Sequence, residues 1–170
     1  MSSVKSSIDG KFYSVRASLP ENTKKEIANR LALINKNIKI LIDYIERNGD
    51  KKYKKNIDLL KSRYHENSIT ENIDLEDTTF TVNKGESIEF CITTRNSKEE
   101  VYDINKLMFV TIHELSHIGS ESYNHTREFT DFFIFLLKSA IACKVYKYQN
   151  YYKDPEEYCG ITIDKTPLVQ

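Results

Sequence analysis

The chain has 170 residues, of which 39% are apolar and 29% charged, and its basic and acidic side chains are equal in number. This length and balance are typical of one globular domain with its own core, rather than of a disordered chain. The longest apolar run, Phe132 to Leu137, is far shorter than the roughly 20 residues that span a bilayer, so no membrane segment is expected. The first twenty residues lack the apolar block of a secretory signal.

The three cysteines, Cys91, Cys143 and Cys159, form no Cys-x-x-Cys pair. Their odd number argues against a disulfide framework, and a reduced intracellular compartment is the simplest expectation. No histidine lies near Cys159 in the sequence, so it is interpreted as a structural residue rather than a ligand or nucleophile.

Charge is distributed unevenly along the chain. Residues 1–66 carry 15 Lys and Arg against 8 Asp and Glu, whereas residues 67–170 carry 10 against 17. The basic half could contact nucleic acid or another acidic partner. It has no arginine-rich or basic–aromatic tract, which favours ordinary solvated helix faces as the interpretation.

The N-terminal part predicts helices. A short strand is expected at residues 11–16, and apolar residues then recur every three or four positions from Glu21 to Arg47. Asn48-Gly49 is a stop signal, and a second amphipathic helix is expected from Lys51 to Tyr64. The polar stretch from His65 to Asp77 is predicted to be a loop.

The period changes in the second half. Residues 78–82 and 86–92 have strand character and flank the turn signal Asn83-Lys84-Gly85, which together predict a β-hairpin. A helix is expected from Asp103 to Ile118, and Gly119 is expected to end it in the left-handed conformation.

The C-terminal part predicts one more helix and a strand. Thr126 is expected to cap a long helix that reaches about Tyr148. The segment from Tyr158 to Ile163 is expected to add a last short strand.

The chemistry of the chain is indicated by His113-Glu114-Leu115-Ser116-His117, an HExxH pattern inside a predicted helix. Four residues advance a helix by about 400°, so both imidazoles project from nearly the same face and can bind one zinc ion. Glu114 lies about 100° around the helix, where its carboxylate is expected to act as general base on a water activated by the metal. The alternative is two histidines on a helix surface plus one histidine in a loop, which the apolar residues around the motif argue against.

A catalytic zinc ion needs a third protein ligand, and His125 is the predicted one. Three of the four histidines lie between His113 and His125, and a break at Gly119 would let the chain turn back toward the metal. Glu121 and Glu128 are the competitors, because a carboxylate completes many two-histidine sites. Glu128 could instead brace a ligand histidine.

His113 to His117, followed by a short loop and His125-Thr126-Arg127-Glu128-Phe129, resembles the WLM and SprT-like zinc peptidases, in which a third histidine stands in an H-x-x-x-F setting. Similarity to WLM-like proteins of large DNA viruses extends to residues 81–85, 103–105 and 157–160, and covers about residues 75–165. His125 follows His117 by eight positions, which is longer than in typical WLM proteins and shorter than in typical SprT proteins.

The resemblance implies an α+β, zincin-like fold in which long helices pack on a small antiparallel sheet and the HExxH motif lies on a central helix. The expected single domain, residues 1–170, comprises a helical part at about 20–66 and a catalytic core at about 75–165. One Zn²⁺ per chain is implied, with His113, His117 and His125 as ligands. We expect the protein in the cytoplasm or nucleus of a host cell, or associated with virions.

The WLM and SprT-like groups cleave proteins crosslinked to DNA or conjugated to ubiquitin or SUMO, which are the substrates that the resemblance implies. In zincins an edge strand pairs with the substrate backbone, and residues 86–92 are the candidate here, although a plain core strand fits the pattern equally well. The candidates for a hydroxyl that stabilises the oxyanion are Tyr123, Tyr151, Tyr152 and Tyr158.

Two functions therefore remain open. One is a zinc metallopeptidase with Glu114 as its base, and the other is a non-catalytic, zinc-stabilised module that binds protein or DNA. A structural zinc site fills all four positions with protein ligands and needs no carboxylate beside an open position, so the presence of Glu114 favours the peptidase.

Overall fold

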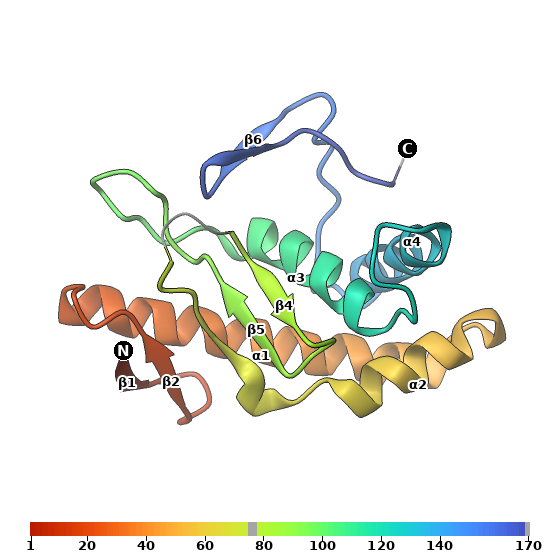
Figure 1. Cartoon of the computed structure of the whole chain (residues 1–170), viewed down its shortest axis with the longest axis horizontal. Helices are drawn as coiled ribbons and strands as arrows, with labels where there is room; N and C mark the ends of the chain where they lie inside the picture. Colours follow the sequence, from red (N-terminus) through yellow and green to blue (C-terminus); the bar gives the residue numbers. More distant parts are fainter. Residues whose placement is uncertain (75–77, 169–170) are drawn as a thin grey trace.

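In the computed structural model, which describes residues 1–74 and 78–168, the long helix α1 (Glu21–Asn48) extends across the molecule (Figure 1). It confirms the helix expected from Glu21 to Arg47. Its apolar stripe is buried, at Ile27, Leu31, Ile34, Ile38, Leu41 and Ile45. Each such side chain stabilises the fold by roughly 1.5–3 kcal/mol relative to an exposed one. The remaining helices and the N-terminal strands pack against this helix.

The N-terminal strands β1 (Ser2–Lys5) and β2 (Phe12–Val15) form an antiparallel hairpin on α1. The strand expected at residues 11–16 is confirmed as β2. A buried ion pair ties this hairpin to the rest of the fold, since Arg16 Nε lies 2.9 Å from Glu71 Oε2. The Arg16 guanidinium also donates to Thr93 Oγ1 at 2.8 Å, which helps to compensate for the loss of water around both charges.

The second helical segment is divided in two. A 3₁₀ turn (Lys51–Tyr53) begins at Asp50, whose side chain accepts from Lys52 N, and α2 (Lys54–Arg63) follows directly. The helix expected from Lys51 to Tyr64 is thus confirmed, with a tighter first turn. It runs back beside α1 (Figure 1).

A three-stranded sheet of order β3-β5-β4 lies beside these helices. It is built from β3 (Ile69–Glu71), β4 (Phe80–Val82) and β5 (Ser87–Phe90). The predicted hairpin is confirmed, because β4 and β5 are antiparallel. The expectation of an antiparallel sheet is wrong, since β3 is parallel to β5.

Strand β3 and a 3₁₀ turn (Glu66–Ser68) lie within the stretch that was expected to be a loop. Three residues among polar neighbours are too short to show a strand period, so β3 depends on its pairing with β5. Residues 75–77 of that predicted loop lie outside the described residues.

Helix α3 (Ile104–Ile118) carries the HExxH sequence and confirms the predicted helix. Its first turn is capped by Asp103, which accepts from Lys106 N at 3.0 Å. The expected left-handed conformation of Gly119 is wrong, because its φ is −84°. Glycine is required there for space: a Cβ would collide with the Phe132 ring and lie 3.1 Å from Asn56 O.

Helix α4 (Arg127–Ala142) packs on α3, and Thr126 caps it as predicted by accepting from Phe129 N at 3.3 Å. It ends at Ala142 rather than near Tyr148. Lys144 has a φ of +66°, which turns the chain out of the helix. The segment beyond is then held by Asn105, which donates to Lys147 O at 2.9 Å and accepts from Lys147 N at 2.8 Å.

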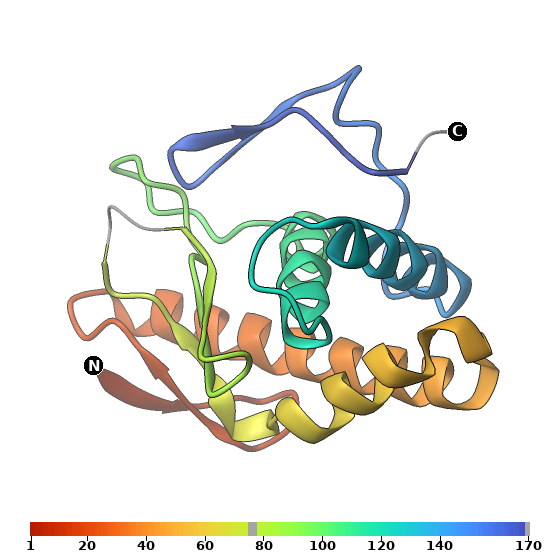
Figure 2. The ribbon, with the colours of Figure 1, turned by 45° about the vertical axis from the view of Figure 1, so that its right-hand side comes forward.

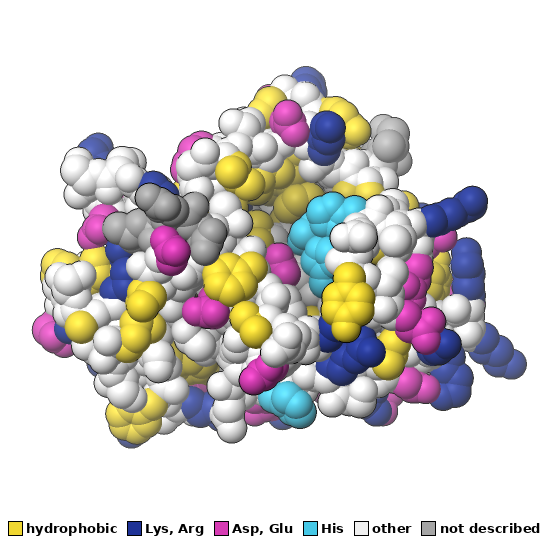
Figure 3. All heavy atoms as spheres, viewed as in Figure 1, with side chains coloured by type: hydrophobic (Ala, Val, Ile, Leu, Met, Phe, Trp, Pro, Cys, Tyr) yellow, Lys and Arg dark blue, Asp and Glu magenta, His cyan; other side chains and the backbone are white. Residues whose placement is uncertain are grey.

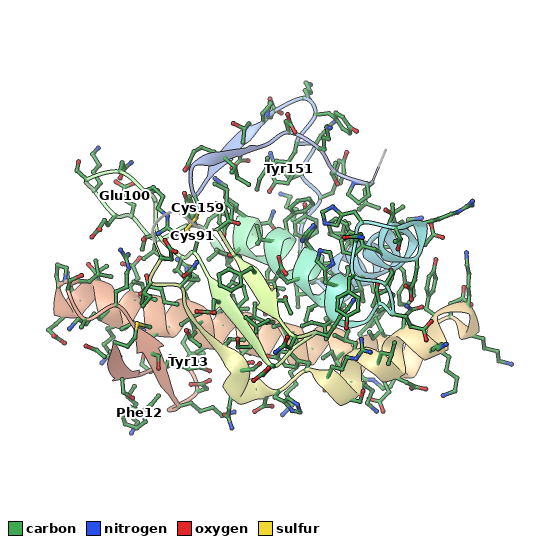
Figure 4. The ribbon with its side chains drawn as sticks, viewed as in Figure 1. Phe12, Tyr13, Cys91, Glu100, Tyr151 and Cys159 are labelled. Carbon is green, nitrogen blue, oxygen red and sulfur yellow. A yellow bond between two sulfur atoms is a disulfide. The ribbon has the colours of Figure 1, made fainter. Side chains whose placement is uncertain are left out.

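The C-terminal segment passes over α3 and α4 and ends in an antiparallel hairpin, β6 (Glu156–Tyr158) and β7 (Ile161–Ile163) (Figure 2). The single strand expected from Tyr158 to Ile163 is wrong, because this segment contains the end of β6, a turn at Cys159 and Gly160, and β7. Cys159, in the turn, forms a disulfide with Cys91 at the end of β5 (Figure 4). The Tyr158 hydroxyl reinforces this junction by donating to Cys91 O at 2.8 Å.

The disulfide corrects the expectation from the cysteine count. Its partners are 68 residues apart, and only the pairing of sheet and hairpin brings them together. Cys143 is the free thiol that makes the number odd. The number of cysteines therefore does not support a reduced compartment, and the cellular location stays a prediction.

Several basic side chains of the N-terminal half have acidic partners. Lys54 lies 3.0 Å from Asp58, and Lys61 lies 2.6 Å from Glu46. These exposed pairs favour the interpretation as solvated helix faces, and nucleic-acid binding stays a prediction. Within the described ranges, no helix is long and apolar enough to cross a membrane.

The disulfide generates a stability prediction. Cys159→Ser should lower the free energy of unfolding by roughly 2–5 kcal/mol, because the unfolded chain loses a cross-link that closes a long loop. Urea unfolding without reductant measures the change. Cys143→Ser is the control and should change stability little. Three reactive thiols in the denatured, unreduced parent would contradict the pairing.

Candidate metal centre

Three imidazoles converge at the C-terminal end of α3. His113 and His117 project from successive turns of the helix, and His125 returns from the loop that joins α3 to α4. One ligand atom from each ring lies within 4.8 Å of the others. The Nε2 atoms of His117 and His125 are 3.1 Å apart.

The donor set fits a zinc ion. Two nitrogens at 2.0–2.1 Å from a tetrahedral zinc are about 3.3 Å apart, close to the separation of the two Nε2 atoms. Burial lowers the pKa of His117 to about 4, with further lowering by the charge of His113. Burial also lowers the pKa of His125. Both imidazoles are thus neutral near pH 7, the form that binds a metal.

Aromatic side chains of α4 support the imidazoles. The Phe129 ring lies 4.3 Å from the ring centroid of His117 and 4.8 Å from that of His125. Phe133 lies 5.4 Å from His113. Because Phe129 follows His125 by four residues, the first turn of α4 places this ring behind the loop between α3 and α4 (residues 119–126, the histidine loop). Packing of this kind limits the rotamers of the histidines.

Glu114 is held beside the histidines by the edge strand β4. Its side chain is only 8% exposed, and Thr81 Oγ1 donates to Glu114 Oε2 at 2.7 Å. Thr81 was not among the residues predicted for the site. Residues 81–85 were noted only as part of the resemblance to viral proteins, and the role of Thr81 depends on the packing of β4 against α3, which local spacing does not indicate.

A pocket of about 400 Å³ opens beside Glu114 and His117. Phe80 and Thr81 of β4 form one wall, and Tyr123 of the histidine loop contributes another. On this face of the molecule, histidine side chains reach the surface beside a hollow that is flanked by hydrophobic side chains (Figure 3).

The carboxylates of Glu121 and Glu128, the alternative ligands, bind other groups of the protein. Glu128 accepts from Glu121 N at 2.9 Å and from Ser122 N at 3.0 Å. Burial alone would raise the pKa of Glu128, but these hydrogen bonds outweigh it and hold the pKa below its usual value. Glu121 is paired with Lys55 at 2.6 Å. The structure therefore groups His125 with the motif histidines, and Glu128 braces the backbone of the loop rather than an imidazole.

Two of the four candidate tyrosines are buried away from solvent. Tyr158 is 1% exposed and its hydroxyl is bonded to Cys91 O, and Tyr151 is 1% exposed and packs on Phe109 (Figure 4). Tyr152 is exposed and is not among the residues that line the pocket. Tyr123, at 79% exposed, is the candidate that lines the pocket.

Fold and site thus define an α+β protein with a three-histidine cluster and a carboxylate beside it. Neither a known family model nor a solved structure matches the chain. The chain is 41% identical over 168 residues to uncharacterized protein R325 of Acanthamoeba polyphaga mimivirus, covering 97% of this chain and 83% of that protein. It belongs to the same family as R325.

A second viral relative matches a smaller part of the chain. Uncharacterized protein 136R of Invertebrate iridescent virus 6 is 38% identical over 68 residues, covering 39% of this chain and 38% of that protein. Both relatives are viral proteins, which supports the expectation of a viral protein.

The geometry generates a ranking of ligand substitutions. His125→Ala should weaken zinc binding as much as His117→Ala, because each removes one of three imidazoles. Glu128→Gln should weaken it less, by roughly 10- to 100-fold, since it disturbs only the support of the loop. Competition with a chromophoric chelator measures all three. A reversed order, with His125→Ala nearly silent, would identify a two-histidine, one-glutamate site.

Proposed function

We propose that this protein is a zinc-dependent metallopeptidase that hydrolyses peptide bonds with water. The observation that carries the proposal is the convergence of three imidazoles, one of which, His117, lines a pocket together with Glu114. Zinc sites with three protein ligands keep a position open for substrate or water, which distinguishes catalytic from structural sites.

In this proposal the histidines bind the metal and Glu114 transfers the proton. His113, His117 and His125 would hold one zinc ion, which when bound polarises a carbonyl and makes water more acidic. Glu114 takes a proton from the attacking water onto its carboxylate and passes it to the departing amine. The hydrogen bond from Thr81 holds Oε2 of this carboxylate, and the proton transfer is assigned to Oε1, which lies 3.5 Å from His113 Nδ1.

Strand β4 is the candidate for binding the substrate backbone. The proposal that residues 86–92 serve as the edge is corrected, because β5 lies in the middle of the sheet and β4 is its edge on the side of α3. An extended peptide paired with β4 would lie along the pocket beside Glu114. Tyr123 could then direct its hydroxyl to the carbonyl oxygen.

The resemblance of residues 113–129 to the WLM and SprT-like peptidases supports this proposal, and a zincin-like fold is part of what we propose. They also suggest the class of substrate, namely proteins crosslinked to DNA or conjugated to ubiquitin or SUMO.

The general base can be tested directly. Glu114→Gln should keep zinc and the fold but lose most hydrolysis of casein, roughly 10²- to 10⁴-fold, because the amide cannot take the proton. Zinc content and initial rates are the measurements. The control is Glu100→Gln, on the exposed loop ahead of α3 (Figure 4), which should retain the parent's rate.

Failure of this test would favour the alternative function. If both the parent and Glu114→Gln bind one zinc ion but hydrolyse no peptide, the protein is a zinc-stabilised module that binds protein or DNA.

The support of the base by β4 generates a separate prediction. Thr81→Val should lower kcat by about 10- to 100-fold with little change in KM, since a hydrogen bond to a charged group is lost. Thr81→Ser retains the hydroxyl and should keep most of the rate. Steady-state kinetics of both variants decide the matter, and equal rates for valine and serine would refute the role of the hydroxyl.

A further inference from the structure

The loop between α3 and α4 is held by polar contacts on its carbonyl groups. Arg63 of α2 donates to Ile118 O at 2.9 Å and to Ser120 O at 3.0 Å. Lys84, in the β4–β5 turn, donates to His117 O at 2.8 Å and to Ser120 O at 2.9 Å. Lys84 also donates to Ser122 O.

The Lys84 ammonium thereby connects two parts of the histidine cluster. His117 O belongs to the last turn of the helix that carries two imidazoles, and Ser122 lies three residues before His125 in the loop that carries the third. A cation at this position is also favoured by the negative end of the α3 dipole. One side chain from the sheet thus fixes the separation between the helix and the loop.

Lys84 has a backbone conformation that is unfavourable for lysine. Asn83 and Lys84 both have a left-handed conformation, with φ of 46° and 56°. Asparagine and glycine are the residues favoured at turn positions with a positive φ, and lysine is not among them. The turn also lies close to α2, since a Cβ at Gly85 would be 2.7 Å from Arg63 O. The conformation therefore places a lysine where its ammonium reaches the loop.

We propose that Lys84 is a positioning residue that sets the placement of His125 relative to His117 and so determines the affinity for zinc. The inference rests on the proposed metal site. It predicts that the β4–β5 turn controls metal binding through the backbone carbonyls of His117 and Ser122, which Lys84 binds.

The test separates this role from a role in the turn. Lys84→Gly removes the ammonium and relieves the left-handed strain, whereas Lys84→Met removes the ammonium and keeps the strain. Both should weaken zinc binding by about 10- to 100-fold, the range for residues that orient metal ligands. The stability of the two metal-free variants should differ, with the glycine variant the more stable.

The matched control is Asn83→Gly, which relieves the same strain in the same turn and removes the side-chain bond to Glu86, but leaves the Lys84 ammonium in place. Its zinc affinity should equal that of the parent. Zinc dissociation constants come from chelator competition, and the visible spectrum of the Co²⁺-loaded full chain reports the geometry of the ligands. The spectrum should change for both Lys84 variants and stay unchanged for Asn83→Gly.

Different results would overturn the positioning role of Lys84 and the proposed metal site. Parent-like affinity and spectrum in Lys84→Gly would overturn the positioning role, as would equal weakening in Asn83→Gly. A parent chain that binds neither zinc nor Co²⁺ would instead overturn the proposed metal site itself, and with it the inference about Lys84.

Discussion

Burial of the apolar stripe along α1 is the interaction on which the other elements depend. The stripe faces the N-terminal hairpin, strand β3 and the helices α3 and α4, so elements from both ends of the chain share one core. Most of these contacts join residues far apart in sequence. The position of α3, and therefore of His113 and His117, follows from its packing on α1, α2, α4 and β4.

The candidate site is polar, yet it is built on this apolar frame by a small number of directed contacts. Close packing of Gly119 against Phe132 lets the chain leave α3 abruptly. Glu128 then binds the N–H groups of the loop, while Lys84 and Arg63 bind its carbonyls. A short loop with its backbone groups held on both sides can place His125 against His117 with little freedom, which is what a metal site requires.

The sheet contributes to the site through one hairpin. Thr81 in β4 holds the Glu114 carboxylate, and three residues later Lys84 holds the histidine loop. The start of the same strand is tied to the C-terminal hairpin, since Tyr158 is hydrogen-bonded to Thr79 and neighbours the disulfide between Cys91 and Cys159. A substrate that pairs with β4 would therefore contact the element that orders both the base and the ligand loop.

The sequence by itself determined the helices and the motif, because both depend on local spacing. A period near 3.6 predicted α1, α2 and α3 closely, and the i, i+4 histidines with Glu114 between them need nothing beyond helical geometry. Only the tertiary structure decided how distant residues meet. Strand β3 is too short for a local signal, the disulfide joins cysteines 68 residues apart, and Thr81 and Lys84 reach the site across the fold. The contacts of Thr81 and Lys84 result from the packing of β4 against α3. The spacing of residues along the sequence does not predict which distant segments pack together.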